Sequence, residues 1–144
     1  MESKEQTIGS LDLENGLTVY FIDSSSPPVA GRCQVRLLIR VPVQPAEEHF
    51  SKYPEPSEAL KRFISLAGPG PAGFQTVKIR NFIKEQDVEK TLEEMKNEFI
   101  RSNMEYLKKP GFAGNFIVKR YEGLCEKEAL RNAYDNALRK TEGG

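Results

Sequence analysis

The sequence predicts an α+β fold, in which a mostly antiparallel four-stranded sheet carries two or three helices packed on one face. Two observations support this class. Apolar and polar residues alternate along several stretches before residue 84, which is typical of half-buried strands. From residue 88 onward the apolar residues recur with the period of amphipathic helices. We therefore expect a sheet that is covered on one side and partly open on the other.

The first two strands form a predicted hairpin. One strand contains Leu11, and the next covers residues 17–22, where apolar and polar side chains alternate. A three-residue loop at positions 14–16, with Gly16 in the left-handed conformation, sets Leu11 opposite Val19. A two-residue loop would place the two apolar sets on opposite faces, so we expect the longer loop.

The third and fourth strands are predicted at residues 32–43 and 74–83. The third strand has the cleanest alternation in the chain. We expect its apolar face to consist of Cys33, Val35, Leu37, Ile39, Val41 and Val43. In the fourth strand we assign Val77, Ile79 and Ile83 to that same buried face, and Thr76, Lys78, Arg80 and Phe82 to the opposite face.

Helices are predicted at residues 57–67, with Ser57 as N-cap, at residues 88–106 after Asp87, and from about residue 124. The segment 112–121 fits a helix or an extended chain. A Pro-rich excursion at about residues 44–73 contains the first helix. Because the C-terminal part offers too few elements for a core of its own, we expect one domain spanning residues 1–144.

The composition excludes several classes of protein. Lysine plus arginine and aspartate plus glutamate each total 21, so no overall charge would attract nucleic acid or a membrane. The first residues precede no apolar stretch of a secretion signal, and no span is long enough to cross a membrane. The two cysteines, Cys33 and Cys125, have no metal-ligand or disulfide-framework spacing. We expect a reducing, cytoplasmic location and no cofactor.

Few residues invite a catalytic or metal-binding interpretation. The glycines of residues 68–73 alternate with prolines, which have no N–H for a phosphate, so we interpret this run as a stiff turn. His49 is the one histidine and lacks a second histidine or cysteine nearby, which favours a surface role. Cys33 fits a buried strand position, whereas Cys125 opens a helix and has no partner base in the sequence. We therefore predict no catalytic residue and no metal ligand.

A basic sheet face is the most informative candidate site. If the third and fourth strands turn their apolar sets inward, their basic residues point outward with an aromatic ring beside them. These residues are Arg32, Arg36, Arg40, Lys78, Arg80 and Tyr20. Such a face can bind an anion or a partner, and it can also be a solvated surface without a ligand. Leu38 and Phe82 on the same side offer an alternative, an apolar centre for self-association.

The run from Leu13 to Val43 is similar to a family of small uncharacterised bacterial proteins. The similarity rests on Asn15-Gly16-Leu17, Asp23, Ser25, Pro28-Val29-Ala30, Arg32, Val35-Arg36-Leu37 and Arg40 to Val43, and further on Phe112, Phe116 and Val118 to Tyr121. The resemblance covers about half of the chain. It implies a bacterial cytoplasmic domain of unknown function and assigns no catalytic residue.

These observations favour a non-enzymatic binding or interaction module that uses the exposed basic sheet face. A protein partner or a second copy is the favoured ligand, and nucleic acid is less favoured because the whole molecule carries no net charge. One alternative is a small enzyme between the Pro-rich segment and the sheet, where the polar residues are Glu47, Glu48, His49 and Cys125. Another is a homodimeric structural protein.

Overall fold

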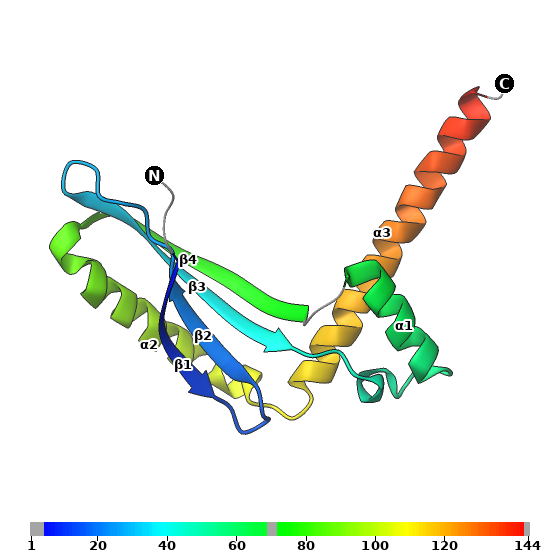
Figure 1. The fold of residues 1–144 in the computed structure, drawn as a ribbon, viewed down its shortest axis with the longest axis horizontal. Coiled ribbons are helices and arrows are strands. Elements are labelled where there is room, and N and C mark those ends of the chain that lie inside the picture. The colour runs from blue at the N-terminus through cyan, green and yellow to red at the C-terminus, as the bar shows by residue number, and fades with distance from the viewer. Residues whose placement is uncertain (1–4, 69–71, 143–144) are drawn as a thin grey trace. The chain divides into compact units, whose positions relative to one another are not determined.

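The computed structural model describes residues 5–68 and 72–142 of the chain, without the side chains of the last two of these (Figure 1). The elements in chain order are β1 (Gln6–Asp12), β2 (Thr18–Asp23), β3 (Arg32–Val43), η1 (Glu47–Phe50), α1 (Pro56–Ala67), β4 (Ala72–Lys84), η2 (Glu85–Asp87), α2 (Val88–Leu107) and α3 (Phe112–Glu142). Four antiparallel strands and three α-helices confirm the α+β class.

The chain groups into two compact units. The sheet unit comprises Met1–Val43 and Gly73–Phe112, and the helical unit comprises Gln44–Ala72 and Ala113–Gly144. The sheet unit contains all four strands and α2, whereas α1 and α3 belong to the helical unit. The predicted Pro-rich excursion thus pairs with the C-terminal helix. The expectation of a single domain over residues 1–144 stays a prediction.

The strands lie in the order β1-β2-β3-β4, so each strand pairs with its neighbour in the sequence. The first turn has the predicted three-residue geometry. Leu11 lies opposite Val19, the Leu13 N–H donates to the carbonyl oxygen of Leu17 at 2.8 Å, and Gly16 has a φ of 87°. The apolar residues of both strands therefore reach the same face of the sheet, as the hydrophobic pattern predicts.

One face of the sheet is covered by α2 (Figure 1). The odd-numbered apolar residues of β3 pack there with those of β2 and α2 in one core: Val19, Phe21, Val35, Leu37, Ile39, Val41, Leu92, Met95 and Phe99. The rings of Phe21 and Phe99 meet edge to face, with their centroids 6.1 Å apart. The predicted apolar face of β3 is therefore the core face, and its polar alternates point to the other side.

The structure corrects the predicted orientation of β4. The side chain of Gln34 donates to that of Asn81, and Arg40 donates to Gln75, so these four side chains share the face away from α2. By alternation Val77 and Ile79 point the same way, and they are 37% and 48% exposed. The prediction that both line the core is wrong, because the register with β3 turns the other set of β4 residues toward α2.

A local irregularity near the end of β4 restores the expected burial of Ile83. Phe82 has a φ of 61°, in the left-handed region that a bulky side chain rarely adopts, and it is 81% exposed. This residue interrupts the alternation, so that Ile83 packs against the core cluster next to α2. The orientation predicted for Ile83 is thus correct, although that of its two apolar neighbours is not.

The helical unit has its own aromatic core. Phe50 from η1, Phe63 from α1 and Tyr121 from α3 pack together, with ring centroids 5.4 to 6.4 Å apart. α1 begins at Pro56 with Glu55 as its N-cap, two residues before the predicted cap Ser57. The segment 112–121, which fits a helix or an extended chain by its sequence, is helical. Residues 69–71 of the predicted stiff turn lie outside the described residues.

Candidate functional site

The face of the sheet away from α2 is the first candidate surface. We call it the outer face and define it by side chains that alternate with the core residues of β2, β3 and β4: Tyr20, Ile22, Arg36, Leu38, Arg40, Gln75, Val77 and Ile79. Tyr20 lies opposite Arg40, and Ile22 lies opposite Leu38. Within the described part of the sheet unit no helix covers this face (Figure 1). Ile22 and Leu38 are buried, so the apolar side chains that the outer face exposes on β4 are Val77 and Ile79, and basic side chains of β3 lie beside them.

The two arginines in the middle of β3 border the apolar centre of the outer face. Arg40 donates from Nε to the side-chain oxygen of Gln75 at 3.2 Å. The Nε atom of Arg36 is buried and has no hydrogen-bond partner among the described residues. Neither guanidinium forms an ion pair with a carboxylate in the described part of the chain. The outer face thus holds positive charge that its own fold leaves uncompensated.

The third basic residue of β3 lies at the beginning of the strand. Arg32 is exposed, and its backbone pairs with Val29 across the turn that enters β3. Its side chain alternates with that of Cys33, which is 6% exposed and lies on the covered side as predicted. Arg32 therefore extends the basic margin of the outer face along β3.

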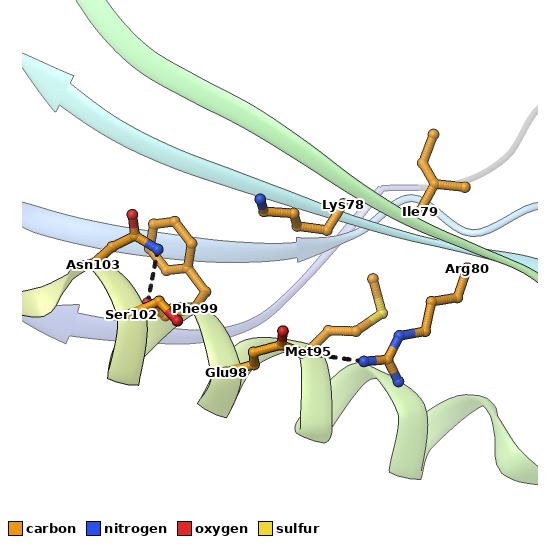
Figure 2. Close-up of a pocket in the computed structure, with 8 residues that line it drawn as sticks. All are labelled: Lys78, Ile79, Arg80, Met95, Glu98, Phe99, Ser102 and Asn103. Carbon is orange, nitrogen blue, oxygen red and sulfur yellow. Dashed lines mark hydrogen bonds and ion pairs between the residues drawn. The ribbon is translucent and has the colours of Figure 1, made fainter.

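Lys78 and Arg80 do not belong to this surface. Figure 2 shows Arg80 directed toward α2 and Ile79 directed away from it. Arg80 forms ion pairs with Glu94 at 3.5 Å and Glu98 at 3.2 Å, both on α2. The prediction that all five basic residues share one face is therefore wrong in its geometry, because the β3–β4 register splits them between the two sides of the sheet.

A shallow groove of about 220 Å³ lies between β4 and α2 (Figure 2). It is lined by Lys78, Ile79, Arg80, Met95, Glu98, Phe99, Ser102 and Asn103. Asn103 donates to the carbonyl oxygen of Phe99 within the same helix, and the charge of Arg80 is balanced by its two glutamates. These contacts hold Asn103 and Arg80 in place, and Lys78 and Ser102 are the other polar residues that line the groove.

The residues of the alternative enzyme hypothesis lie in the helical unit. Glu47 and Glu48 are exposed on η1, whereas His49 is half-buried. The Nδ1 atom of His49 accepts a hydrogen bond from the Ala46 N–H at 3.0 Å, which makes it a structural acceptor. Its ring lies 3.9 Å from the point where a Cβ on Gly114 would be, so the histidine packs against the beginning of α3.

Cys125 is not beside that histidine. It lies 11 residues after Gly114 on α3, which corresponds to about 16 Å along the helix. Its thiol instead interacts with the hydroxyl of Tyr121 one turn earlier. The four polar residues of the enzyme hypothesis are therefore not brought together, because His49 faces one end of α3 and Cys125 lies in its middle.

Burial and neighbouring groups shift the pKa of three side chains around this thiol. Burial raises the pKa of Tyr121, and a hydrogen bond with Cys125 raises it further. Burial also raises the pKa of Tyr53, with a smaller effect from the charge of Glu122. A 2.9 Å hydrogen bond to Glu128 raises the pKa of Arg62. Both tyrosines therefore stay neutral to a higher pH than a free phenol would.

Over residues 5–68 and 72–142, no group of three or more His, Cys, Asp or Glu side chains could hold a metal ion. Among the described helices, none has the length and apolar content needed to cross a membrane. Both cysteines are free thiols.

Sequence reasoning missed Val77 and Ile79 as part of an exposed surface. Strand alternation identifies the two sets of side chains in β4, but both sets contain apolar residues. Only the cross-strand pairs Gln34–Asn81 and Arg40–Gln75 show which set faces α2. The Gln and Asn side chains on both strands could have indicated the correct orientation, because polar cross-strand pairs prefer the solvent-exposed face of a sheet.

Comparison with known proteins found no family model, no curated protein and no solved structure that matches the chain. The resemblance of residues 13–43 to a family of small bacterial proteins therefore gains no support from these comparisons and stays a prediction.

Proposed function

We propose that the protein is a non-enzymatic interaction module whose outer face binds a protein segment rich in carboxylate and aliphatic side chains. The observation that supports this proposal is the arrangement of Arg36 and Arg40 beside the exposed side chains of Val77 and Ile79 on a helix-free sheet face. An apolar centre with an arginine margin is the usual composition of a protein interface.

Charge complementarity supports an acidic partner. Arg36 has a buried Nε without a partner, and an unsatisfied buried donor costs about 1 to 3 kcal/mol. A carboxylate from the partner would pair with the terminal nitrogens of this guanidinium and offset its positive charge, although the buried Nε itself lies out of reach of a partner. Arg40 donates from Nε to Gln75, and no residue in the described part of the chain pairs with its terminal nitrogens, so these can bind a second carboxylate.

The same geometry favours protein over nucleic acid. A surface that follows a phosphate backbone needs several cations, but Lys78 and Arg80 lie on the α2 side of the sheet. Of the six predicted binding residues, Tyr20, Arg32, Arg36 and Arg40 remain on the outer side. Val77 and Ile79 occupy the positions beside them, and their side chains have no group that could bind a phosphate. The outer face is thus better matched to aliphatic side chains between carboxylates.

A selection from a random peptide library displayed on phage tests the proposal with the full chain as bait. We expect selected peptides to be enriched in Asp and Glu next to Val, Ile or Leu. Their binding should fall by roughly tenfold or more with Arg36→Glu, since one charged hydrogen-bonded pair is worth about that much. Arg101→Glu makes the same charge change on an exposed position of α2 and should leave peptide binding unchanged.

Two results would overturn this proposal. One is a selection whose peptides bind Arg36→Glu and Ile79→Asp as tightly as the unmodified protein. The other is tight, salt-sensitive binding of labelled single-stranded RNA that Arg36→Glu abolishes, because a polyanion site would then be the better description of the outer face.

Neither alternative hypothesis gains a comparable observation. The enzyme hypothesis needs His49 near Cys125. His49 of η1 packs against the beginning of α3, whereas Cys125 lies in the middle of that helix. The homodimer hypothesis needs an exposed Leu38, yet this residue is 5% exposed, while Phe82 is 81% exposed. The cytoplasmic location remains part of the proposal, and the free thiols of Cys33 and Cys125 are consistent with a reducing compartment.

A further inference from the structure

β4 forms an open edge of the sheet. In the strand order β1-β2-β3-β4 its one neighbour is β3, and within the described sheet unit no strand lies on its other side. β4 is 13 residues long, whereas the open edges of sheets are commonly short or blocked. An extended peptide segment can join such an edge through backbone hydrogen bonds. The edge of β4 is therefore a feature, besides the outer face, that a partner can bind.

The hydrogen bonds of β3 show which of its backbone groups face β4. The N–H of Ser24 donates to the carbonyl oxygen of Arg36 at 3.0 Å, and the N–H of Ser26 donates to that of Gln34 at 3.1 Å. The even-numbered residues of β3 thus direct their backbone groups toward the segment that continues β2. Because the two sides alternate along a strand, the odd-numbered residues of β3 direct their backbone groups toward β4.

Two side-chain pairs give the register of β4. The side chain of Gln34 bonds to that of Asn81. Six positions further along β3, Arg40 bonds to Gln75, which lies six positions before Asn81. Even-numbered residues of β3 therefore lie opposite odd-numbered residues of β4, and both sets direct their backbone groups away from the boundary between the two strands. The residues of β4 whose N–H and C=O groups point to the open edge are Gln75, Val77, Ile79 and Asn81.

The groove between β4 and α2 borders this edge (Figure 2). Ile79 lines the groove although its side chain points away from α2, so the main chain of Ile79 forms the border. A strand bonded to Ile79 would direct every second side chain into the groove, where Met95 and Phe99 offer an apolar surface. The charge of Arg80 on this side is balanced by two glutamates. Aliphatic side chains therefore suit this inner row of an added strand.

The other row of side chains would lie on the outer face beside Val77 and Ile79. Arg36 lies opposite Ile79 in this register, and the Nε of Arg40 reaches Gln75 on β4. Strands two places apart in a sheet are separated by about 10 Å, which the side chains of an arginine and a glutamate span together. Because neither guanidinium pairs with a carboxylate among the described residues, carboxylates suit the outer row.

We propose, on the basis of the proposed function, that the acidic and aliphatic partner segment binds as a fifth strand on β4. Carboxylate side chains alternate along it with aliphatic ones, the first row on the outer face and the second in the groove. The regular part of the edge ends before Phe82, whose φ of 61° interrupts the strand. The bound segment therefore spans about nine residues, opposite positions 73–81.

A second copy of β4 fits this edge less well than an acidic segment. β4 carries Lys78, Arg80 and Lys84 and no acidic residue. If two copies pair antiparallel with Val77 and Ile79 at the contact, Lys78 of one copy lies opposite or diagonal to Lys78 or Arg80 of the other. Like charges in these positions destabilise a sheet. Lys78 has no ion-pair partner in the described part of the chain that would cancel this repulsion.

Amide hydrogen exchange of the full chain, followed by NMR, tests the edge directly. In the free protein the amides of Val77 and Ile79 should exchange at least roughly tenfold faster than those of Thr76 and Lys78, because only the latter bond to β3. The probe is a capped peptide of about nine residues that alternates glutamate with valine. When this peptide saturates the protein, exchange at Val77 and Ile79 should slow by roughly tenfold or more.

Two methylated versions of the same peptide provide a matched pair. One carries N-methyl groups on the glutamate amides and the other on the valine amides. Every second amide of an added strand points to β4, so one version should bind roughly tenfold or more weakly than the parent peptide, and the other should bind like the parent. Fluorescence anisotropy of labelled peptides measures these affinities, with Arg36→Glu as the variant that tests the charge pairing.

The outcomes separate the fifth strand from the proposed function. Equal binding of both methylated peptides overturns the fifth strand, and the proposed function stands if that binding still falls with Arg36→Glu. Binding that depends on the methylated set but not on Arg36→Glu supports the fifth strand and overturns the acidic pairing. No binding of the parent peptide up to about 1 mM overturns both. Protection of Val77 and Ile79 that grows with protein concentration, without peptide, assigns the edge to a second copy and overturns the proposal.

Discussion

The side-chain amide of Asn15 donates a 2.8 Å hydrogen bond to the carbonyl oxygen of Leu107, although the two residues are 92 positions apart. The same amide donates to the carbonyl oxygen of Lys109 at 3.0 Å, and its oxygen accepts from the N–H of Leu17. The β1–β2 turn therefore satisfies carbonyl groups at the end of α2 that would otherwise lack partners. This contact ties the hairpin to the helix that covers the core.

Replacement of Asn15 should destabilise the sheet unit. We expect Asn15→Ala to lower the free energy of unfolding by about 1 to 3 kcal/mol, because it removes the donor to the carbonyl of buried Leu107, whereas the exposed carbonyl of Lys109 can bond to water instead. Asn15→Asp keeps the acceptor for Leu17 but places a negative charge at a helix C-terminus, so its effect should be at least as large. Urea unfolding followed by circular dichroism measures both. A near-normal stability for Asn15→Asp would show that the amide donors contribute little.

The orientation of β4 predicts opposite responses from two isoleucines of the same strand. Ile79 is 48% exposed on the outer face, whereas Ile83 packs against the core cluster. Ile83→Ala should therefore cost about 2 kcal/mol of stability, while Ile79→Ala should stay within about 0.5 kcal/mol. Both variants replace isoleucine with alanine in the same strand, so the change in β-propensity is the same for the two. Thermal unfolding that showed similar losses of about 2 kcal/mol for both variants would support the sequence-based orientation instead, because that orientation buries both isoleucines.

The sequence predicted those features that depend on near neighbours. The alternation around β3 and the turn at Gly16 follow from local chemistry, and both agree with the structure. The side of β4 depends instead on its register with β3, a non-local property that alternation cannot determine when both faces carry apolar residues. The left-handed Phe82 adds an irregularity that no residue preference predicts.

The candidate site shows the same limit. Arg32, Arg36 and Arg40 were placed correctly relative to one another, since they lie on one strand with a fixed period. Lys78 and Arg80 were not, because their side depends on pairing between strands. Helicity of segment 112–121 was also undecidable locally, since burial of Ile117 and Tyr121 against another segment stabilises that helix.

Replacement of Gly16 and of Gly123 by alanine should change the free energy of unfolding in opposite directions. Gly16 has a φ of 87°, so Gly16→Ala should cost about 1 to 2 kcal/mol even though the site has open space. Gly123 lies within α3, also with open space around it, and Gly123→Ala should stabilise the helix by about 0.5 to 1 kcal/mol. Denaturant midpoints report both changes. A stabilising Gly16→Ala would contradict the left-handed turn.

The raised pKa values of Tyr53 and Tyr121 predict loss of stability in alkali. Burial raises both pKa values above the ordinary value of about 10, so the folded chain retains protons that the unfolded chain releases. Their contribution is therefore fully present below pH 10 and declines as the pH rises through the folded pKa values. Tyr121→Phe cannot ionise, so its stability should fall less steeply above about pH 10 than that of the unmodified protein.

Unfolding measured at several alkaline pH values, with phenolate absorbance recorded in parallel, distinguishes the possibilities. Tyr134 provides the control, because it is 65% exposed and Tyr134→Phe should leave the alkaline slope unchanged. If Tyr121→Phe showed the same slope as the unmodified protein, Tyr121 would not be held neutral by its packing against Phe50 and Phe63. If the slope decreases as expected, the packing of Tyr121 with Phe50 and Phe63 keeps its hydroxyl neutral in the folded chain, and its ionisation in alkali weakens that packing.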